Sequence, residues 1–202
     1  MIEILKATLN DLQSIHDMAQ VVFRHTYREI LSPEQMEYMM EMMYSLPNLH
    51  QQIEEGHHYY IAYDIPASSC VGEASSDGGK NTPCGYVSVQ HQGKDDDGVE
   101  VFHLHKIYVM PQAQGRGVGV RLFQTVVDHV RSEIDSAIDG GYAMTASQQP
   151  KARIELNVNK HNSAVNFYKH IGMRIIHEED YPIGNGFYKT DYIMAMDILC
   201  GA

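Results

Sequence analysis

The chain has 202 residues, 44% of them hydrophobic, and a formal net charge of −11, values that suit an ordinary soluble α/β protein of one domain. The negative charge argues against nucleic acid or an anionic membrane surface as the main partner. No apolar run approaches the ~20 residues of a membrane span, and the first residues do not resemble a signal peptide. The three cysteines (Cys70, Cys84 and Cys200) are odd in number and widely spaced, so we expect a reduced, cytoplasmic protein.

Helices are predicted early in the chain. Residues 1–8 alternate as a strand, and Asn10 or Asp11 is the expected cap of the first helix. Ser32 followed by Pro33 has the pattern of a second helix start. Methionines at helical spacing usually belong to a core, but they also suit a wall that accommodates a flexible apolar ligand. The methionines of this second helix are Met36, Met39, Met40, Met42 and Met43.

The middle of the chain alternates between strands and turns. Strands are predicted at 59–63, 85–91 and 99–109. Residues 64–84 are rich in Ser, Gly, Pro and Asn, so we expect an exposed, mobile hairpin insertion there.

After residue 103 the chain runs as a strand, passes a proline, crosses a glycine-rich turn and becomes a helix. Gly115, Gly117 and Gly119 stand at the helix start, where Ser, Asp or Asn usually caps the backbone. Bare glycines leave the N–H groups open to a ligand, although a tight turn is the commoner reason for such a cluster. With the helix dipole and Arg116, they form an anion site suited to a pyrophosphate.

The last quarter predicts a strand at 153–158, a short helix that starts at Asn162 or Ser163, and two strands at 173–178 and 187–197. The order of elements is that of an α/β protein and by itself permits several topologies.

Two segments carry a family resemblance. Gln114 to Gly119 fits Gln/Arg-x-x-Gly-x-Gly/Ala and resembles the acetyl-CoA loop of the GNAT (Gcn5-related) N-acetyltransferases. Residues 162–173 are similar to that family's Asn-x-x-Ala-x-x-x-Tyr-x-x-x-Gly-Phe segment, with two departures. Asn162 stands one place nearer the alanine, which weakens its expected contact with pantetheine, and Met173 replaces the usual phenylalanine. Segments 23–27, 32–34 and 190–194 further resemble the PaiA-type polyamine N-acetyltransferases.

The resemblance implies one domain over residues 1–202 with an α/β GNAT fold. That fold is a mixed, mostly antiparallel seven-stranded sheet flanked by helices on both faces. It also implies acetyl-CoA as co-substrate, no metal, and an oxyanion donor among the backbone N–H groups near Val109. The residues expected to bind acetyl-CoA are Ile107, Tyr108, Val109, Gln114, Gly115, Arg116, Gly117, Val118, Gly119, Val120, Asn159, Asn162 and Tyr168.

Acetyl transfer to an amine needs a base, because the ammonium form, with a pKa of about 10, has no lone pair. His103 and His105 are two apart on a strand and therefore face the same side. The pair resembles that of arylalkylamine acetyltransferases, in which it drains the amine proton through water. Two alternatives stay open: satisfied polar side chains, or a zinc site, for which no third ligand is evident nearby. Glu100 is an outside candidate for the base, on the opposite face.

Tyr168 occupies the position where family members hold the general acid beside the sulfur, and its alternative role is packing in a short helix. The expected acceptor is a small polyamine such as spermidine or spermine, bound near Thr26, Tyr27 and Tyr188. A second ammonium would be anchored by Glu29 and Asp191. Alternatives are an enzyme acting on protein or peptide amino groups and a non-catalytic acetyl-CoA-binding regulator. We expect no nucleic-acid or membrane partner and a homodimer.

Overall fold

A computed structural model describes residues 1–65, 81–138 and 151–199. The helices are α1 (Leu12–Tyr27), α2 (Pro33–Tyr44), α3 (Leu46–Glu54), α4 (Val118–Ile138) and α5 (Ala164–His170), with short 3₁₀ turns at Leu9–Asp11 and Pro111–Ala113. The strands are β1 (Ile2–Lys6), β2 (His58–Asp64), β3 (Thr82–Lys94), β4 (Glu100–Val109), β5 (Lys151–Asn159), β6 (Arg174–Gly184) and β7 (Phe187–Leu199).

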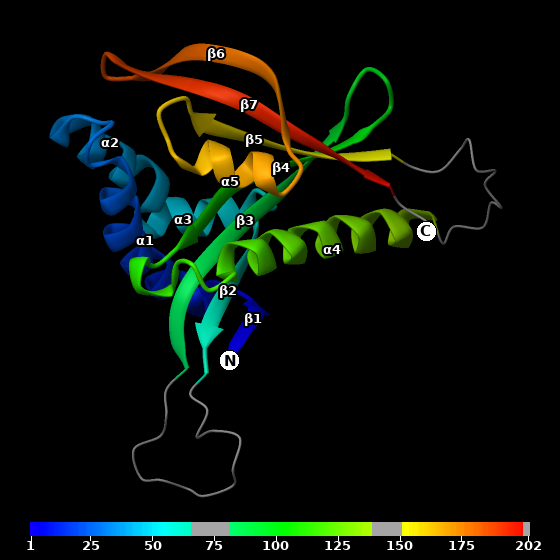
Figure 1. The fold of residues 1–202 in the computed structure, drawn as a ribbon, viewed down its shortest axis with the longest axis horizontal. Coiled ribbons are helices and arrows are strands. Elements are labelled where there is room, and N and C mark those ends of the chain that lie inside the picture. Colours follow the sequence, from blue (N-terminus) through cyan, green and yellow to red (C-terminus); the bar gives the residue numbers. More distant parts are fainter. Residues whose placement is uncertain (66–80, 139–150, 200–202) are drawn as a thin grey trace, which may run out of the picture.

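The strands form one seven-stranded sheet in the order β1-β2-β3-β4-β5-β7-β6. Neighbouring strands are antiparallel, except for β4 and β5, which are parallel. The β4–β5 pairing is short and runs only from Glu100–Ala152 to His103–Glu155. Beyond His103 the two strands separate, as Figure 1 shows, and α5 lies beside the gap. The second half of β4 is thereby left without a strand partner on its β5 side among the described residues.

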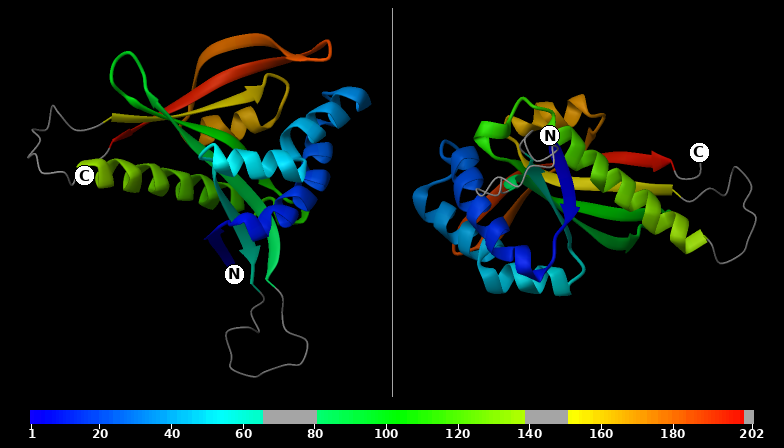
Figure 2. Two further views of the ribbon diagram at one scale, coloured as in Figure 1. Left: turned by 180° about the vertical axis from the view of Figure 1, so that it is seen from behind. Right: turned by 90° about the horizontal axis from the view of Figure 1, so that it is seen from below.

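Helices cover both faces of this sheet (Figure 2). Buried side chains of α4 and α5, among them Leu122, Val126 and Val165, pack with Phe102, Leu104 and other residues on one face of the sheet. On the other face, α1, α2 and α3 form a second core around Phe23, Tyr44, Leu49, Tyr59 and Tyr86. The predicted α/β fold with a mixed, mostly antiparallel seven-stranded sheet is therefore confirmed.

Element boundaries differ from the sequence predictions in three places. Asp11 precedes α1 as predicted, but its carboxylate accepts from the Thr8 N–H at 2.7 Å, and Thr8 Oγ1 accepts from the Asn10 N–H. Thr8 is therefore the side chain that caps this turn. The insertion predicted at 64–84 is shorter, because Asp64 belongs to β2 and β3 begins at Thr82; residues 66–80 lie outside the described residues. β6 continues to Gly184, beyond the predicted end at 178.

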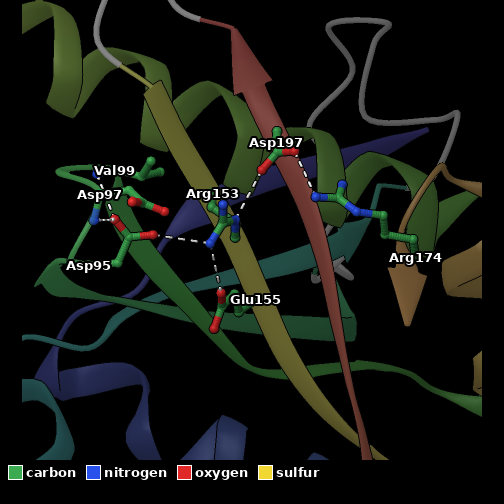
Figure 3. A network of polar contacts seen from close by, with 7 residues as sticks. All are labelled: Asp95, Asp97, Val99, Arg153, Glu155, Arg174 and Asp197. Carbon is green, nitrogen blue, oxygen red and sulfur yellow. Dashed lines mark hydrogen bonds and ion pairs between the residues drawn. The ribbon is translucent and has the colours of Figure 1, made fainter. Parts of the chain in front are cut away.

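Arg153 holds together the end of the sheet where β4 and β5 still pair (Figure 3). Its Nη1 donates to Asp95 in the β3–β4 turn at 3.1 Å, and its Nε donates to Asp197 of β7 at 3.0 Å. Asp197 also accepts from Arg174 of β6 at 2.8 Å. The β3–β4 turn, β5, β6 and β7 are thus tied together at one end, which leaves the opposite ends of β4 and β5 to diverge.

Among the described residues, no helix combines the length and the apolar composition needed to cross a membrane.

Candidate active site

The glycine-rich turn opens α4 as the sequence predicts. Gly115 and Gly117 have positive φ values of 73° and 75°, a backbone region that glycine enters without steric cost. The first N–H groups of a helix have no intrahelical partners, so this end presents donors and the positive end of the dipole. Gly119 differs from these two: it lies against α5, where a Cβ would be in ordinary contact with the Phe167 ring at 3.4 Å. The turn therefore supplies an anion site with α5 packed beside it.

A cavity of about 500 Å³ lies along the gap between β4 and β5, and we call it the loop cavity. It runs from the glycine turn past the second half of β4 to α5 and α1. Of the residues predicted to bind acetyl-CoA, those that line it are Ile107, Tyr108, Val109, Gln114, Gly115, Gly117, Val118, Gly119, Val120, Asn162 and Tyr168.

Two predicted cofactor residues lie elsewhere. Arg116 does not line the loop cavity; it pairs with Asp64 of β2 at 2.7 Å, so its guanidinium already has a carboxylate partner. Asn159 lines a neighbouring cavity, and its amide contacts Thr190 and the His161 N–H. Asn157, two residues earlier on β5, lines the loop cavity instead and was missed from the sequence.

That neighbouring cavity, of about 330 Å³, contains three histidines, and we call it the histidine cavity. His103 and His105 both line it, as their predicted common face requires, with ring centroids 4.5 Å apart. His57, the residue before β2, adds a third ring whose centroid lies 4.2 Å from that of His105. Its Nδ1 lies 3.1 Å from Ser88 Oγ, and His105 Nε2 lies 3.0 Å from Gln90 Oε1.

A β-bulge in β4 brings a lysine into the same cavity. Ser88 pairs with Lys106 but Val89 pairs with Leu104, so His105 is the extra residue and the alternation shifts after it. As a result His105 and the next residue, Lys106, both line the histidine cavity. Lys106 is only 5% exposed, and its Nζ donates to Gln52 Oε1.

Burial and nearby positive charge keep these histidines neutral. Burial, followed by the charges of Lys189 and Lys106, lowers the pKa of His103 to about 4. Burial and the neighbouring histidines lower the pKa of His105 to about 2. Burial and Lys106 lower the pKa of His57 to about 4. The Lys106 ammonium is itself affected: burial and then Lys189 lower its pKa to about 7.

Tyr168 lies on α5 and lines the loop cavity, as its proposed role as acid requires. Burial raises its pKa above the ordinary value, so the phenol keeps its proton at neutral pH. Asn162 Oδ1 accepts from the Ala164 N–H at 2.9 Å, and its Nδ2 donates to the Tyr27 hydroxyl at 3.4 Å. Asn162 thus starts α5 and also orients Tyr27 at the cavity wall.

The predicted acceptor residues are only partly brought together. Tyr27, Tyr188 and Asp191 line the histidine cavity, with Met39, Met42 and Met43 of α2 as an apolar wall. Thr26 lines the loop cavity instead, where its hydroxyl donates to Val22 O. Glu29 lies outside both cavities; it is exposed and pairs with Arg28 at 3.4 Å.

The geometry bears on two alternatives that the sequence left open, a metal site at the histidine pair and Glu100 as the base. Among the described residues, the group of side chains that could hold a metal ion is His58, His129 and Glu133, on the α4 face of the sheet; it does not include His103 or His105. Glu100 pairs with His91 at 2.8 Å and with Lys94 at 3.3 Å, and lies outside both cavities.

Acidification is expected to destabilise the fold through the buried histidines. In the unfolded chain a histidine titrates near pH 6.5, whereas His57 and His103 titrate near 4 in the fold. Between these values the unfolded chain binds more protons, so stability present above pH 6.5 is lost as the pH falls toward 4. The loss should be on the order of 1–2 kcal/mol per histidine by pH 5.

Urea unfolding at pH 7.5 and pH 5 measures this loss. His57→Gln should make it smaller, while the matched change of the exposed His50 should not. An equal loss in the wild type and in both variants would contradict the assignment.

Comparison with known proteins agrees with this geometry. The model of the acetyltransferase (GNAT) family matches residues 25–140, more than half of the chain. A PaiA N-acetyltransferase from Thermoplasma acidophilum, solved with coenzyme A, is 19% identical with a TM-score of 0.63, over 96% of this chain and 98% of that one. The ribosomal-protein-S18-alanine N-acetyltransferase from Escherichia coli is 15% identical with a TM-score of 0.59, over 100% and 97%. NAA60 from Arabidopsis thaliana, solved with a bisubstrate analogue, is 16% identical with a TM-score of 0.59, over 98% and 99%. These solved structures share the fold, and the family match establishes that the chain belongs to the GNAT acetyltransferases.

Proposed function

We propose that this chain transfers the acetyl group of acetyl-CoA to a primary amine that enters the histidine cavity. The observation that carries this proposal is the junction of the two cavities. Five residues line both of them: Tyr27, His105, Lys106, Tyr108 and Asn157. A thioester in the loop cavity and an amine in the histidine cavity would therefore meet beside His105.

The loop cavity suits the parts of acetyl-CoA. The pyrophosphate fits the open N–H groups between Gly115 and Val120. Pantetheine carries two amides, and Ile107 and Val109 belong to the part of β4 that, among the described residues, has no strand partner on its β5 side. An extended ligand can pair with such an edge as an added strand.

The chemistry follows from the groups at the junction. The amine loses its proton through His105 and His103 and attacks the thioester carbonyl directly, which forms the new C–N bond. A backbone N–H near Val109 stabilises the oxyanion. The C–S bond then breaks, and the Tyr168 hydroxyl donates to the departing thiolate, which leaves more readily when it is protonated.

Acceptor identity divides into two candidates. A polyamine such as spermidine is the prediction from the sequence, and Asp191 with the methionine wall supports it, but Glu29 lies too far out to contribute. A peptide amino group is the second candidate, since one of the solved structures of this fold is a ribosomal-protein-S18-alanine N-acetyltransferase. The volume of the histidine cavity, about 330 Å³, favours a small molecule over a peptide. A cytoplasmic location and a homodimer stay predictions.

The test is release of coenzyme A from acetyl-CoA with a panel of acceptors: spermidine, spermine, simple amines, amino acids and short peptides. Turnover with at least one primary amine is expected, and Tyr168→Phe should lower kcat far more than it weakens acetyl-CoA binding. Tight binding of acetyl-CoA without turnover on any acceptor would favour the regulator instead.

A further inference from the structure

Two lysines face the histidine cavity without a carboxylate partner. Lys106 reaches it from β4, after the bulge, and Lys189 reaches it from β7. Neither forms an ion pair within 4 Å among the residues that the structure describes. Lys106 has one neutral acceptor, Gln52, and lies 5.3 Å from the Tyr59 ring centroid. Gln52 Oε1 also accepts from the Tyr59 hydroxyl at 2.6 Å, so it is shared.

Buried charges in proteins are normally paired, because desolvation of an isolated ammonium is costly. Here the ammonium of Lys106 has no such partner: burial and then the charge of Lys189 lower the pKa of Lys106 to about 7. Burial also lowers the pKa of Lys189, and Asp191 on the same strand opposes that shift. Asp191, itself 5% exposed, accepts from Tyr181 and is the single carboxylate among the described lining residues. The empty cavity therefore holds more positive than negative charge.

We propose that the amine acceptor also carries a carboxylate, which binds between Lys106 and Lys189 in the histidine cavity. The proposal rests on the proposed function and specifies its substrate class. A polyamine would add further ammonium groups to a cavity that already contains two lysines, whereas a carboxylate supplies the missing partner.

The β-bulge at His105 in β4 specifies the class of amine acceptor further. It places His105, the base candidate, directly beside Lys106 on one wall, so the amine and the carboxylate are held close together. An α-amino acid, with its amine one carbon from the carboxylate, is the class of acceptor that holds these two groups closest together. The apolar side of the cavity, made by Phe23, Leu31 and the α2 methionines, then receives an apolar side chain. The acceptor class is an α-amino acid with an apolar side chain.

Matched acceptors test this directly. L-Methionine, its methyl ester and 3-(methylthio)propylamine share one side chain and differ in the carboxylate; the phenylalanine series repeats the comparison with an aromatic ring. kcat/KM is expressed per concentration of free amine, since the three amines have different pKa values. The value of kcat/KM for the free acid is expected to exceed the values for the ester and the decarboxylated amine by about tenfold or more. Removal of one partner of a buried charge pair typically costs at least this much.

Lysine variants test whether the preference for the free acid over the ester depends on these two lysines. Lys189→Gln should raise KM for the free acid while changing KM for the ester little, and Lys189→Arg should restore part of the preference. Lys94→Gln, which removes an exposed lysine of the β3–β4 hairpin outside both cavities, is the charge-matched control and should change neither. Equal losses for acid and ester in Lys189→Gln would overturn the proposal.

Proton uptake gives an independent measurement on the unaltered protein. A bound carboxylate raises the pKa of Lys106 from about 7, so N-acetyl-L-methionine binding at pH 8 should take up protons, seen by calorimetry in buffers of different ionisation enthalpy. No uptake, together with equal kcat/KM for acid and ester, would sink the carboxylate subsite but leave the acetyltransferase assignment intact. Failure of acetyl-CoA to bind, or of every amine to react, would instead refute the proposed function.

Discussion

Replacing Gly117 by glutamate is expected to abolish measurable acetyl-CoA binding while the protein stays folded. A Cβ at Gly117 would meet nothing within 4 Å, so the substitution fits sterically into the fold. The φ of 75° remains strained for any other residue, and the new carboxylate lies where the pyrophosphate should bind. Like charges about 4 Å apart near a protein surface repel by about 4 kcal/mol, so a loss of at least about 100-fold is expected.

The chain offers a matched control for this variant. Gly93 has a φ of 91° and equally open space around its Cβ, but it lies at the far end of β3 and outside both cavities. Gly93→Glu should therefore carry similar strain and charge without changing the affinity measured by calorimetry. Gly117→Ala separates strain from charge and should lose less than Gly117→Glu. Unchanged acetyl-CoA affinity in folded Gly117→Glu would refute the assignment of the loop.

The glycine-rich turn before α4 could be predicted from local sequence signals, whereas its contacts with distant residues could not. Gly115 and Gly117 are needed because of their own backbone angles, so their spacing is visible in the chain. The ion pair of Arg116 with Asp64 joins residues 52 positions apart, and no local pattern indicates it. The packing of Gly119 against Phe167 likewise depends on a distant helix.

The bulge in β4 is visible in the sequence as a change in the alternation of apolar and polar residues, which a strict two-residue period does not detect. Phe102 and Leu104 belong to the core beneath α4, and so do Ile107 and Val109, so the apolar positions change from even to odd numbers between Leu104 and Ile107. That change of phase marks an inserted residue and predicts a lysine on the histidine side. No such trace exists for His57 or Lys189, because they reach the cavity from other parts of the chain, just before β2 and on β7.

The histidines provide the second large effect. His105→Ala is expected to lower kcat by about 10²–10⁴, the usual contribution of a general base, and His103→Ala by less. The loss should be larger for His105→Ala because His105 lines both cavities, whereas His103 lines only the histidine cavity. Because both pKa values lie at about 4 or below, neither ring should titrate between pH 6 and 9, and the wild-type profile should show no histidine step.

The loss should become smaller as the pH rises, because more acceptor is then present as free amine and less proton removal is required. The pKa values of the empty cavity make both histidines weak bases, and the charges of Lys106 and Lys189 contribute to this weakness. An acceptor carboxylate that neutralises these lysines would strengthen the bases. The loss in the double alanine variant should therefore be larger with a free amino acid than with its ester. A double variant with the wild-type rate at pH 7 would make both histidines structural, and Lys106, with a pKa of about 7, would become the next candidate for the base.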